Sequence, residues 1–353
     1  MSAGSGPAKR GTAPEMAGAV RFGLVGAGVI AQSHVAALRS LPGAEIVGVA
    51  DSRPEAARAL AEECGCAAHS DHVALAQATN VDAVIVCTPP AFHPALTIDL
   101  LERDIAVLCE KPLAIDSESA RAMCEASRSS GALFTMASKF RYVEDVVRAR
   151  SLVASGIVGD VVLFENAFTG RVDMSQRWNS QQRISGGGVL IDNGTHAVDL
   201  LRYFLGPIEE VQAVEGKRLQ HLEVEDTAQL FVRSRDGVMG TIDLSWSVDK
   251  RLDDFLRIHG SEGTLRVGWQ GSYYARHGSP WVRFGEGYDK LGAFTSQLEN
   301  FVAALRGEED LRVTPEDGLA SVRVIEAAYR SLDSSRYVPV EPVLRAAAEP
   351  QGA

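Results

Sequence analysis

Short apolar runs alternate with helix-like segments over the first 140 residues, and this alternation constrains the fold more than any other feature. The apolar runs lie at 21–25, 45–50, 83–87, 105–109 and 133–137. Helices are predicted between them at 29–41, 54–63, 94–103 and 117–129. Strands that are apolar throughout and alternate with helices predict a parallel sheet covered by helices on both faces.

The pattern changes after residue 140, where strand-like segments follow one another. After a helix at 143–154, strands are predicted at 160–168, 210–215, 227–232, 238–246, 255–259 and 264–267, with a further helix at 195–205. Tight turns at 234–237 and 261–263 join successive strands, which predicts a largely antiparallel sheet. Helices near 294–306 and 315–332 close the chain.

The length of 353 residues exceeds what one ordinary core accommodates and indicates two domains. The predicted division is a disordered leader at 1–19, a first domain at 20–140, a second domain at 141–340 and a tail at 341–353. Few helices remain to cover the second sheet. One of its faces is therefore expected to lie in a homodimer or homotetramer.

Composition excludes several classes of partner. A net charge of −11 argues against nucleic acid and against anionic membrane surfaces. No apolar run approaches the roughly 18 residues that span a bilayer, and the first residues contain no signal-peptide core, so a cytoplasmic location is expected. The five cysteines are odd in number and lack ligand-like spacing, which predicts reduced thiols and no metal site.

A glycine-rich loop, Gly26-Ala27-Gly28-Val29-Ile30-Ala31, follows the first strand and opens the first helix. In this pattern one glycine permits a tight turn, the next lets backbone approach a pyrophosphate, and the helix N-terminus stabilises the anion. A purely structural turn is the alternative. The predicted dinucleotide contacts are Gly26, Gly28, Val29 and Ile30.

The second strand ends at Asp51, about 20 residues beyond the loop, where a carboxylate can bind a ribose 2′-hydroxyl. That carboxylate would repel a 2′-phosphate, so NAD is predicted over NADP. Arg53 complicates the prediction because it can stack on adenine or accommodate a phosphate. Alternatively, Asp51 only caps the helix that begins at Pro54. The predicted fold class is thus an α/β Rossmann domain plus an α+β domain with a large, mostly antiparallel open sheet.

Two further segments carry side chains suited to proton transfer. Lys111, in Glu110-Lys111-Pro112, directly follows an apolar strand, so its ammonium is expected at the ligand-binding edge of the sheet. Asp192 and His196 lie four residues apart and share one face if a helix covers both. Histidine accepts a proton near neutral pH. The alternatives are a surface lysine, a helix-capping aspartate and a core histidine.

Together these motifs resemble the Gfo/Idh/MocA family, named for glucose-fructose oxidoreductase, inositol dehydrogenase and rhizopine catabolism. The Glu110-Lys111-Pro112 tripeptide and the Asp192-Asn193-Gly194-Thr195-His196 segment carry the resemblance, which runs from about Val20 to Val340. It implies that Lys111, Asp192 and His196 are catalytic. It also implies substrate contacts from Lys111, Arg141, Arg171, Trp178, Asp192, Asn193 and His196.

The resemblance places Thr88, Pro89 and His93 on the nicotinamide side, although His93 can equally be a helix-start residue. Glu110 and Lys111 are expected beside the cofactor as well, with Glu110 orienting or capping. The implied activity is hydride transfer between a nicotinamide and a secondary hydroxyl or ketone of a sugar, nucleotide sugar or cyclitol. Two alternatives remain, a glycosidase that retains NAD and a dinucleotide-binding regulator without catalysis.

Overall fold

The computed structural model describes residues 18–343, so the predicted leader and tail fall largely outside the described residues. The first domain confirms the predicted parallel sheet, whose strand order is β3-β2-β1-β4-β5-β6. Its elements are β1 (Val20–Val25), α1 (Val29–Ser40), β2 (Ala44–Ala50), α2 (Pro54–Cys64), β3 (Ala67–His69), α3 (His72–Ala78), β4 (Ala83–Val86), η1 (Pro90–Phe92), α4 (His93–Leu101), β5 (Ala106–Glu110), α5 (Ser117–Ser130) and β6 (Phe134–Ala137).

The order of these strands reverses between β1 and β4, since β2 and β3 extend to one side and β4, β5 and β6 to the other. All five neighbouring pairs are parallel. Ligands of such sheets bind beyond the carboxyl ends of the strands at this reversal. The sequence did not predict β3 and α3, because β3 is a three-residue edge strand with little burial and no apolar run.

The second domain confirms the predicted large and mostly antiparallel sheet, in the order β14-β13-β12-β11-β7-β10-β9-β8-β15. Only the β7–β10 pair is parallel. Its elements and those that close the chain are η2 (Lys139–Tyr142), α6 (Glu144–Ala154), β7 (Val161–Thr169), η3 (Trp178–Ser180), α7 (Gln182–Ser185), α8 (Val189–Leu205), β8 (Ile208–Glu215), β9 (Thr227–Ser234), β10 (Met239–Ser245), β11 (Asp254–Gly260), β12 (Gly263–Gly268), β13 (Ser272–Arg276), β14 (Val282–Gly285), α9 (Lys290–Leu305), α10 (Pro315–Ser334) and β15 (Val338–Pro339).

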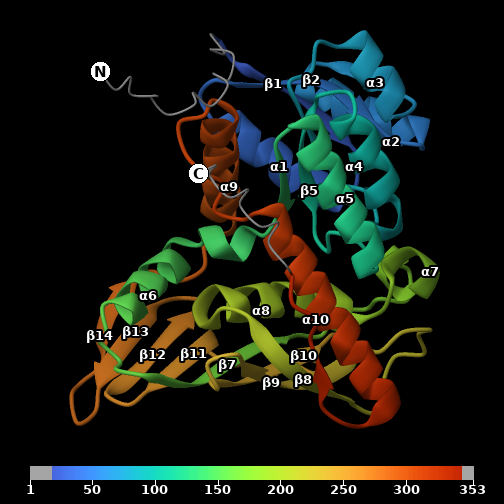
Figure 1. The fold of residues 1–353 in the computed structure, drawn as a ribbon. Helices are drawn as coiled ribbons and strands as arrows, with labels where there is room; N and C mark the ends of the chain where they lie inside the picture. Colours follow the sequence, from blue (N-terminus) through green and yellow to red (C-terminus); the bar gives the residue numbers. More distant parts are fainter. Residues whose placement is uncertain (1–17, 344–353) are drawn as a thin grey trace, which may run out of the picture.

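One face of the nine-stranded sheet is covered by α6, α8 and α10, and the opposite face is turned away from every described helix (Figure 1). Along β7 the alternation places Phe164 and Phe168 on the covered side, where they join the largest apolar cluster. Partly exposed residues alternate with them on the open side. The sheet therefore supports α8, the helix that carries Asp192 and His196.

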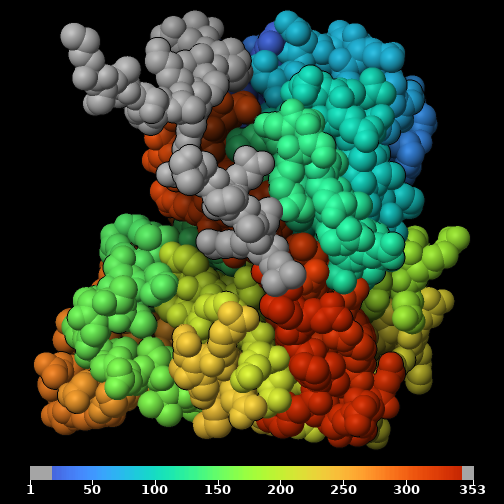
Figure 2. Space-filling view, viewed as in Figure 1, coloured from blue at the N-terminus to red at the C-terminus, as the bar shows by residue number. Residues whose placement is uncertain are grey.

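The last two helices tie the domains together. Although α9 follows the second sheet in sequence, its Phe294, Leu298 and Phe301 join the apolar cluster of β1 and α1. Full burial of such side chains contributes about 1.5–3 kcal/mol each. Helix α10 contacts α5 and β6 of the first domain as well as α8 and β8 of the second. In the space-filling view the red segment that contains α10 begins directly below the first domain and extends along the second (Figure 2).

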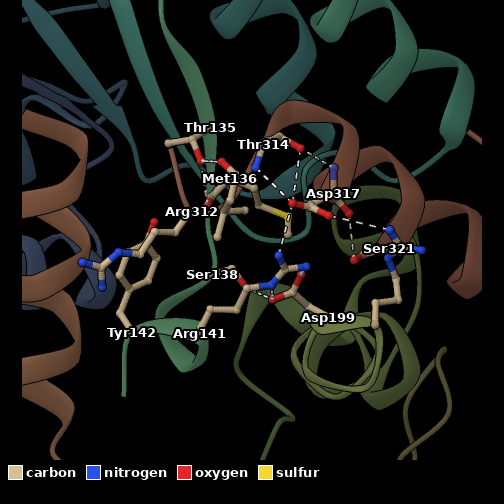
Figure 3. A network of polar contacts seen from close by, with 12 residues as sticks. Thr135, Met136, Ser138, Arg141, Tyr142, Asp199, Arg312, Thr314, Asp317 and Ser321 are labelled. Atoms are coloured by element: carbon tan, nitrogen blue, oxygen red, sulfur yellow. Dashed lines mark hydrogen bonds and ion pairs between the residues drawn. The ribbon is translucent and has the colours of Figure 1, made fainter. Parts of the chain in front are cut away.

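A buried ionic network at the same junction fixes the position of α8 (Figure 3). Arg141, on η2, donates from Nε and Nη2 to Asp199 of α8 at 2.8 and 2.6 Å, and from Nη1 to Asp317 of α10 at 3.1 Å. Ser138 donates to the same Asp199 carboxylate. Burial alone would lower the pKa of Arg141, but the two carboxylates outweigh burial and raise it.

Loss of Arg141 is expected to destabilise the fold strongly, because Asp199 would stay buried without its partner. Removing one member of a buried ion pair costs about 3–5 kcal/mol. Arg141→Met should lower the free energy of unfolding by that amount in urea titrations. Arg148→Met is the control, since Arg148 pairs with Glu144 on the exposed side of α6 and such pairs contribute about 1 kcal/mol or less. Equal losses in the two variants would contradict the anchoring role.

Candidate active site

The glycine-rich loop has the geometry that a bound pyrophosphate requires. Gly26 has a φ of +98°, and a Cβ at this position would lie 2.8 Å from the backbone of Cys87, so only glycine fits. Gly28 precedes α1 without a side-chain cap, and nothing lies within 4 Å of the Cβ it lacks. Beside it, Val29 is 90% exposed. The first N–H groups of α1 thus remain open to an anion.

Asp51 lies at the end of β2 and faces this loop. Its carboxylate accepts hydrogen bonds from the backbone N–H of Ala27 at 2.8 Å and of Arg53 at 2.8 Å. The Arg53 guanidinium also donates to it, while the Arg53 side chain stays largely exposed. Although burial opposes ionisation, Arg53 and Ala27 lower the pKa of Asp51. A charged acceptor therefore lies at the end of β2 beside the glycine-rich loop.

The segment after β4 places Thr88 and Pro89 at the same edge of the sheet. The Thr88 hydroxyl is buried and has no hydrogen-bond partner among the described residues. His93 is fully buried, and its two ring nitrogens lie 2.9 Å from the Pro112 carbonyl and 2.7 Å from the Thr88 carbonyl. This placement does not support the predicted cofactor contact of His93, because both nitrogens are engaged. The residue instead starts α4 and joins the segments that follow β4 and β5.

Glu110 ends β5 and holds the backbone of the lysine that follows. Its Oε2 accepts the Lys111 N–H at 3.1 Å, and its Oε1 lies 2.8 Å from Nε2 of His34 on α1. Burial opposes ionisation, yet the His34 contact and the charges of Lys111 and Lys139 lower the pKa of Glu110. The sequence analysis missed His34. Its signal was a polar residue on the face of α1 that otherwise carries buried apolar side chains.

Lys111 contacts Asp192 across the two domains. Its ammonium forms an ion pair with the Asp192 carboxylate and donates to the Asp192 backbone carbonyl at 3.1 Å. The side chains are 15% and 21% exposed, so the pair is sheltered while still reachable by a small ligand. The Lys111–Pro112 peptide bond is cis. The structure thus unites two residues that lie 81 positions apart in the sequence.

His196 lies one turn beyond Asp192 on α8, which covers both residues and satisfies the predicted spacing. The Phe140 ring lies edge-on at 5.0 Å between centroids, and Phe168 follows at 6.5 Å. Nδ1 is buried and has no partner among the described residues. Burial first, and the charges of Lys111 and Lys139 second, hold the pKa of His196 well below its ordinary value. His196 is therefore neutral at pH 7, and burial and the two lysine charges disfavour its protonated form.

The N-terminus of α8 is capped by a residue from another part of the chain. Glu225, just before β9, accepts the N–H groups of Gly188 at 3.0 Å and Leu190 at 2.9 Å, and the Tyr329 hydroxyl at 2.9 Å. A Cβ on Gly188 would lie 2.0 Å from the Glu225 carbonyl oxygen. The glycine run before α8 thus permits this close approach. The sequence analysis missed Glu225 because the capping contact spans 37 residues.

The remaining predicted substrate residues are scattered. Arg141 is committed to Asp199 and Asp317, so its placement does not support substrate contact and gives it a positioning role. Arg171 is exposed beyond β7, and Trp178, on η3, is 39% exposed. Asn193 makes a long contact of 3.5 Å with the Phe168 carbonyl beside the Lys111–Asp192 pair.

The described residues 18–343 contain no group of three or more His, Cys, Asp or Glu side chains arranged to hold a metal ion. None of their helices is both long and apolar enough to cross a membrane. One hollow of about 310 Å³ is lined by residues that include Gln229, Asp243 and Lys250. It lies on the open face of the nine-stranded sheet, away from Lys111 and His196.

The fold and the site define a dinucleotide-binding α/β protein with a lysine, a carboxylate and a neutral imidazole at the ligand-binding edge of its sheet. Residues 20–138 match the family described as "Oxidoreductase family, NAD-binding Rossmann fold". Residues 146–266 match the "GFO/IDH/MocA C-terminal domain". The chain belongs to the Gfo/Idh/MocA oxidoreductase family, as its motifs predicted.

Relatives and solved structures cover between 64% and 92% of this chain. Inositol 2-dehydrogenase of Rhizobium meliloti (strain 1021) is 27% identical over 91% of this chain and 99% of its own. D-glucoside 3-dehydrogenase of Escherichia coli (strain K12) is 31% identical over 64% and 66%. The WlbA dehydrogenase of Bordetella pertussis, solved with NADH and UDP-GlcNAcA, is 25% identical with a TM-score of 0.82, covering 92% of this chain and 99% of its own.

The low pKa of His196 predicts a pH-dependent contribution to stability. The unfolded histidine, with a pKa of about 6.5, takes up a proton as the pH falls, whereas the folded one stays neutral. The free energy of unfolding therefore falls below about pH 6.5, by at most about 1.4 kcal/mol per pH unit for one proton. His196→Asn abolishes this loss, so the wild type should lose stability relative to the variant between pH 7 and pH 5.

Urea titrations at several pH values measure this difference. His277→Asn, on an exposed turn, controls for the replacement of a histidine outside the site. A difference between His196→Asn and the wild type that does not change with pH would contradict the assignment of His196 as a neutral imidazole.

Proposed function

We propose that this chain is an NAD-dependent dehydrogenase that oxidises a secondary hydroxyl, or reduces the matching ketone, of a sugar, nucleotide sugar or cyclitol. The observation that carries the proposal is the Lys111–Asp192 pair beside the neutral His196 at the carboxyl end of β5. The named relatives, an inositol and a D-glucoside dehydrogenase, support the substrate class.

The cofactor residues fit a dinucleotide. The open N-terminus of α1 would hold the pyrophosphate, Asp51 the adenosine ribose, and the unpartnered Thr88 hydroxyl the nicotinamide end. When bound, the nicotinamide ring accepts or returns the hydride. The chain itself then has to place the substrate carbinol and remove one proton from its hydroxyl.

The chain performs these tasks with three side chains. Lys111 and Asp192 share a contact that a substrate hydroxyl can enter, with Lys111 donating to its oxygen and Asp192 accepting its proton in a hydrogen bond. We assign His196 as the general base because it is neutral and carries a nitrogen without a partner among the described residues, and its lowered pKa makes it a weaker base than an exposed histidine. In reduction the same groups return the proton. The two lysine charges disfavour imidazolium, which favours transfer of the proton onward to solvent.

A substrate screen separates this function from its alternatives. Sugars and cyclitols are supplied with NAD and with NADP, and nicotinamide absorbance is followed. Stoichiometric NADH formation supports the dehydrogenase. Glycoside cleavage without net NADH would identify the NAD-retaining glycosidase. Binding of NAD without either reaction on any substrate would favour the regulator.

The preference for NAD is expected to depend on Asp51. Asp51→Ser removes the carboxylate that would repel a 2′-phosphate, while Arg53 remains free to bind one. The ratio of kcat/KM for NADP to that for NAD should rise by about tenfold or more. A tenfold change corresponds to about 1.4 kcal/mol. Glu55→Ser, which removes an exposed carboxylate from the first turn of α2, should leave the ratio unchanged. An unaltered ratio in Asp51→Ser would exclude Asp51 from cofactor choice.

Lys111→Met is expected to retain NADH binding and lose turnover. The glycine loop and Asp51 hold the dinucleotide, whereas Lys111 serves the reacting hydroxyl. Loss of a positioned proton-transfer group lowers kcat by roughly 100-fold or more. NADH fluorescence titration beside the rate assay separates the two effects, and Lys250→Met on the open sheet face is the control. Near-normal turnover in Lys111→Met would refute the catalytic role.

The open face of the nine-stranded sheet supports the predicted homodimer or homotetramer as well, because half-exposed Leu163, Phe231 and exposed Met239 lie on it. The molar mass in solution distinguishes the two assemblies from a monomer.

A further inference from the structure

A second lysine, Lys139, lies at the same edge of the first sheet as Lys111. It begins η2 two residues after β6 ends, and β6 runs beside β5 with Ala137 opposite Glu110. The carboxyl ends of neighbouring parallel strands meet at one edge, so Lys139 emerges next to Lys111. Like Lys111, Lys139 follows an apolar strand closely in the sequence, but the sequence motifs did not predict a role for it.

Aromatic rings surround the Lys139 ammonium. Its Nζ lies 5.3 Å from the ring centroid of Phe140, 5.4 Å from that of Phe294 and 5.8 Å from that of Tyr288. Such distances permit cation–π attraction, which offsets part of the cost of removing the charge from water. It does not replace the hydrogen bonds that water provided.

No carboxylate among residues 18–343 lies within ion-pair distance of Lys139. Both nearby acids are already engaged, since Asp192 pairs with Lys111 and Glu110 contacts His34 and the Lys111 N–H. Burial, reinforced by the charges of Lys111 and Lys290 and opposed by those of Glu110 and Asp192, lowers the pKa of Lys139 to about 8. The ammonium is thus largely charged at pH 7 and lacks an anionic partner.

The same rings continue into a partly exposed aromatic wall. Tyr288 stacks on Phe140 at 5.3 Å, and Trp269 meets Tyr288 edge-on at 5.6 Å between centroids. Phe140 also contacts His196, so the wall runs from Lys139 past the predicted base. Trp269 is 39% exposed at its outer end. Apolar surface with a few convergent polar groups is typical of a small-ligand site.

We propose that Lys139 binds an oxyanion carried by the substrate, so that the preferred substrate is an acidic sugar or cyclitol, either a carboxylate or a phosphate ester. This inference rests on the proposed dehydrogenase function. The aromatic wall faces the apolar side of the ring, Lys111, Asp192 and His196 hold the reacting hydroxyl, and Lys139 pairs with the anion. A neutral sugar leaves the partly buried charge of Lys139 without an anionic partner.

Binding to the NADH-loaded protein tests the inference independently of turnover. The probes are glucuronate, glucose 6-phosphate and glucose, titrated by calorimetry into the wild type, Lys139→Gln and Lys139→Arg. Wild type should bind one acidic probe at least about tenfold more tightly than glucose, the scale of a hydrogen bond to a charged group. Glucuronate and the phosphate ester distinguish the two sources of oxyanion.

Lys139→Gln should lose this preference without a change in the Kd for NADH, and Lys139→Arg should keep most of it. Lys290→Gln is the matched control, because Lys290 lies 5.9 Å from the same Phe294 ring but is exposed on α9. It should retain the preference. In turnover assays, Lys139→Gln should mainly raise KM for acidic substrates and leave KM for their neutral counterparts unchanged.

Several outcomes would overturn the inference. In the wild type, these are equal binding of acidic and neutral probes, or no binding of any probe. In Lys139→Gln, they are an unchanged preference for the acidic probe, or a weaker affinity for NADH, which would assign Lys139 to the cofactor. Turnover of neutral sugars with any of these results leaves the dehydrogenase proposal standing. Preferential binding of an acidic probe without oxidation of any substrate would instead support the Lys139 site and contradict the dehydrogenase.

Discussion

The contact between Lys111 and Asp192 joins two domains, and the candidate site depends on it. Lys111 is presented by a parallel sheet, whereas Asp192 belongs to a helix supported by a different sheet. A displacement of α8 by one residue, 1.5 Å along its axis and 100° around it, would separate the pair and turn His196 away. The elements that fix α8 therefore matter as much as the three side chains themselves.

Two buried carboxylates fix α8, one before and one after the stretch that carries Asp192 and His196. Glu225 accepts N–H groups at the start of the helix, and Asp199 is held by Arg141 in a bidentate pair one turn beyond His196. Arg141 also reaches Asp317 in the first turn of α10, the helix that contacts both domains. The network thus couples the helix that carries His196 to the junction between the domains.

The charges around the site explain why His196 stays neutral and Glu110 stays charged. Lys111 has a carboxylate partner, and Glu110 retains its charge because His34 and two lysines compensate for burial. His196 has no acidic partner and faces the same lysines, so burial and repulsion both favour the neutral imidazole. The imidazole of His196 is therefore neutral near pH 7, while the neighbouring Lys111 is paired with Asp192.

The sequence was sufficient for features that depend on local pattern. Apolar runs predicted the parallel sheet, and the glycine spacing predicted the loop after β1. Because Lys111 directly follows an apolar strand, the sequence also predicted that it lies at the ligand-binding edge of the sheet. Contacts between distant segments were not predictable in this way. The Glu225 cap, the His34–Glu110 contact and the return of α9 to α1 all require a partner far along the chain. For the same reason the sequence could not show that Arg141, predicted to contact substrate, and His93, predicted to contact the cofactor, bind protein groups instead.

A double-mutant cycle on Lys111 and Asp192 tests most directly whether they act as one unit with the reacting hydroxyl. Once the screen has identified a substrate, kcat/KM is measured for Lys111→Met, Asp192→Asn and the double variant, with NADH affinity as the check on folding. Residues that act together are strongly non-additive, so the double variant should be no more than a fewfold slower than the slower single variant. Additive losses, the double variant losing the product of the two single factors, would contradict a shared role.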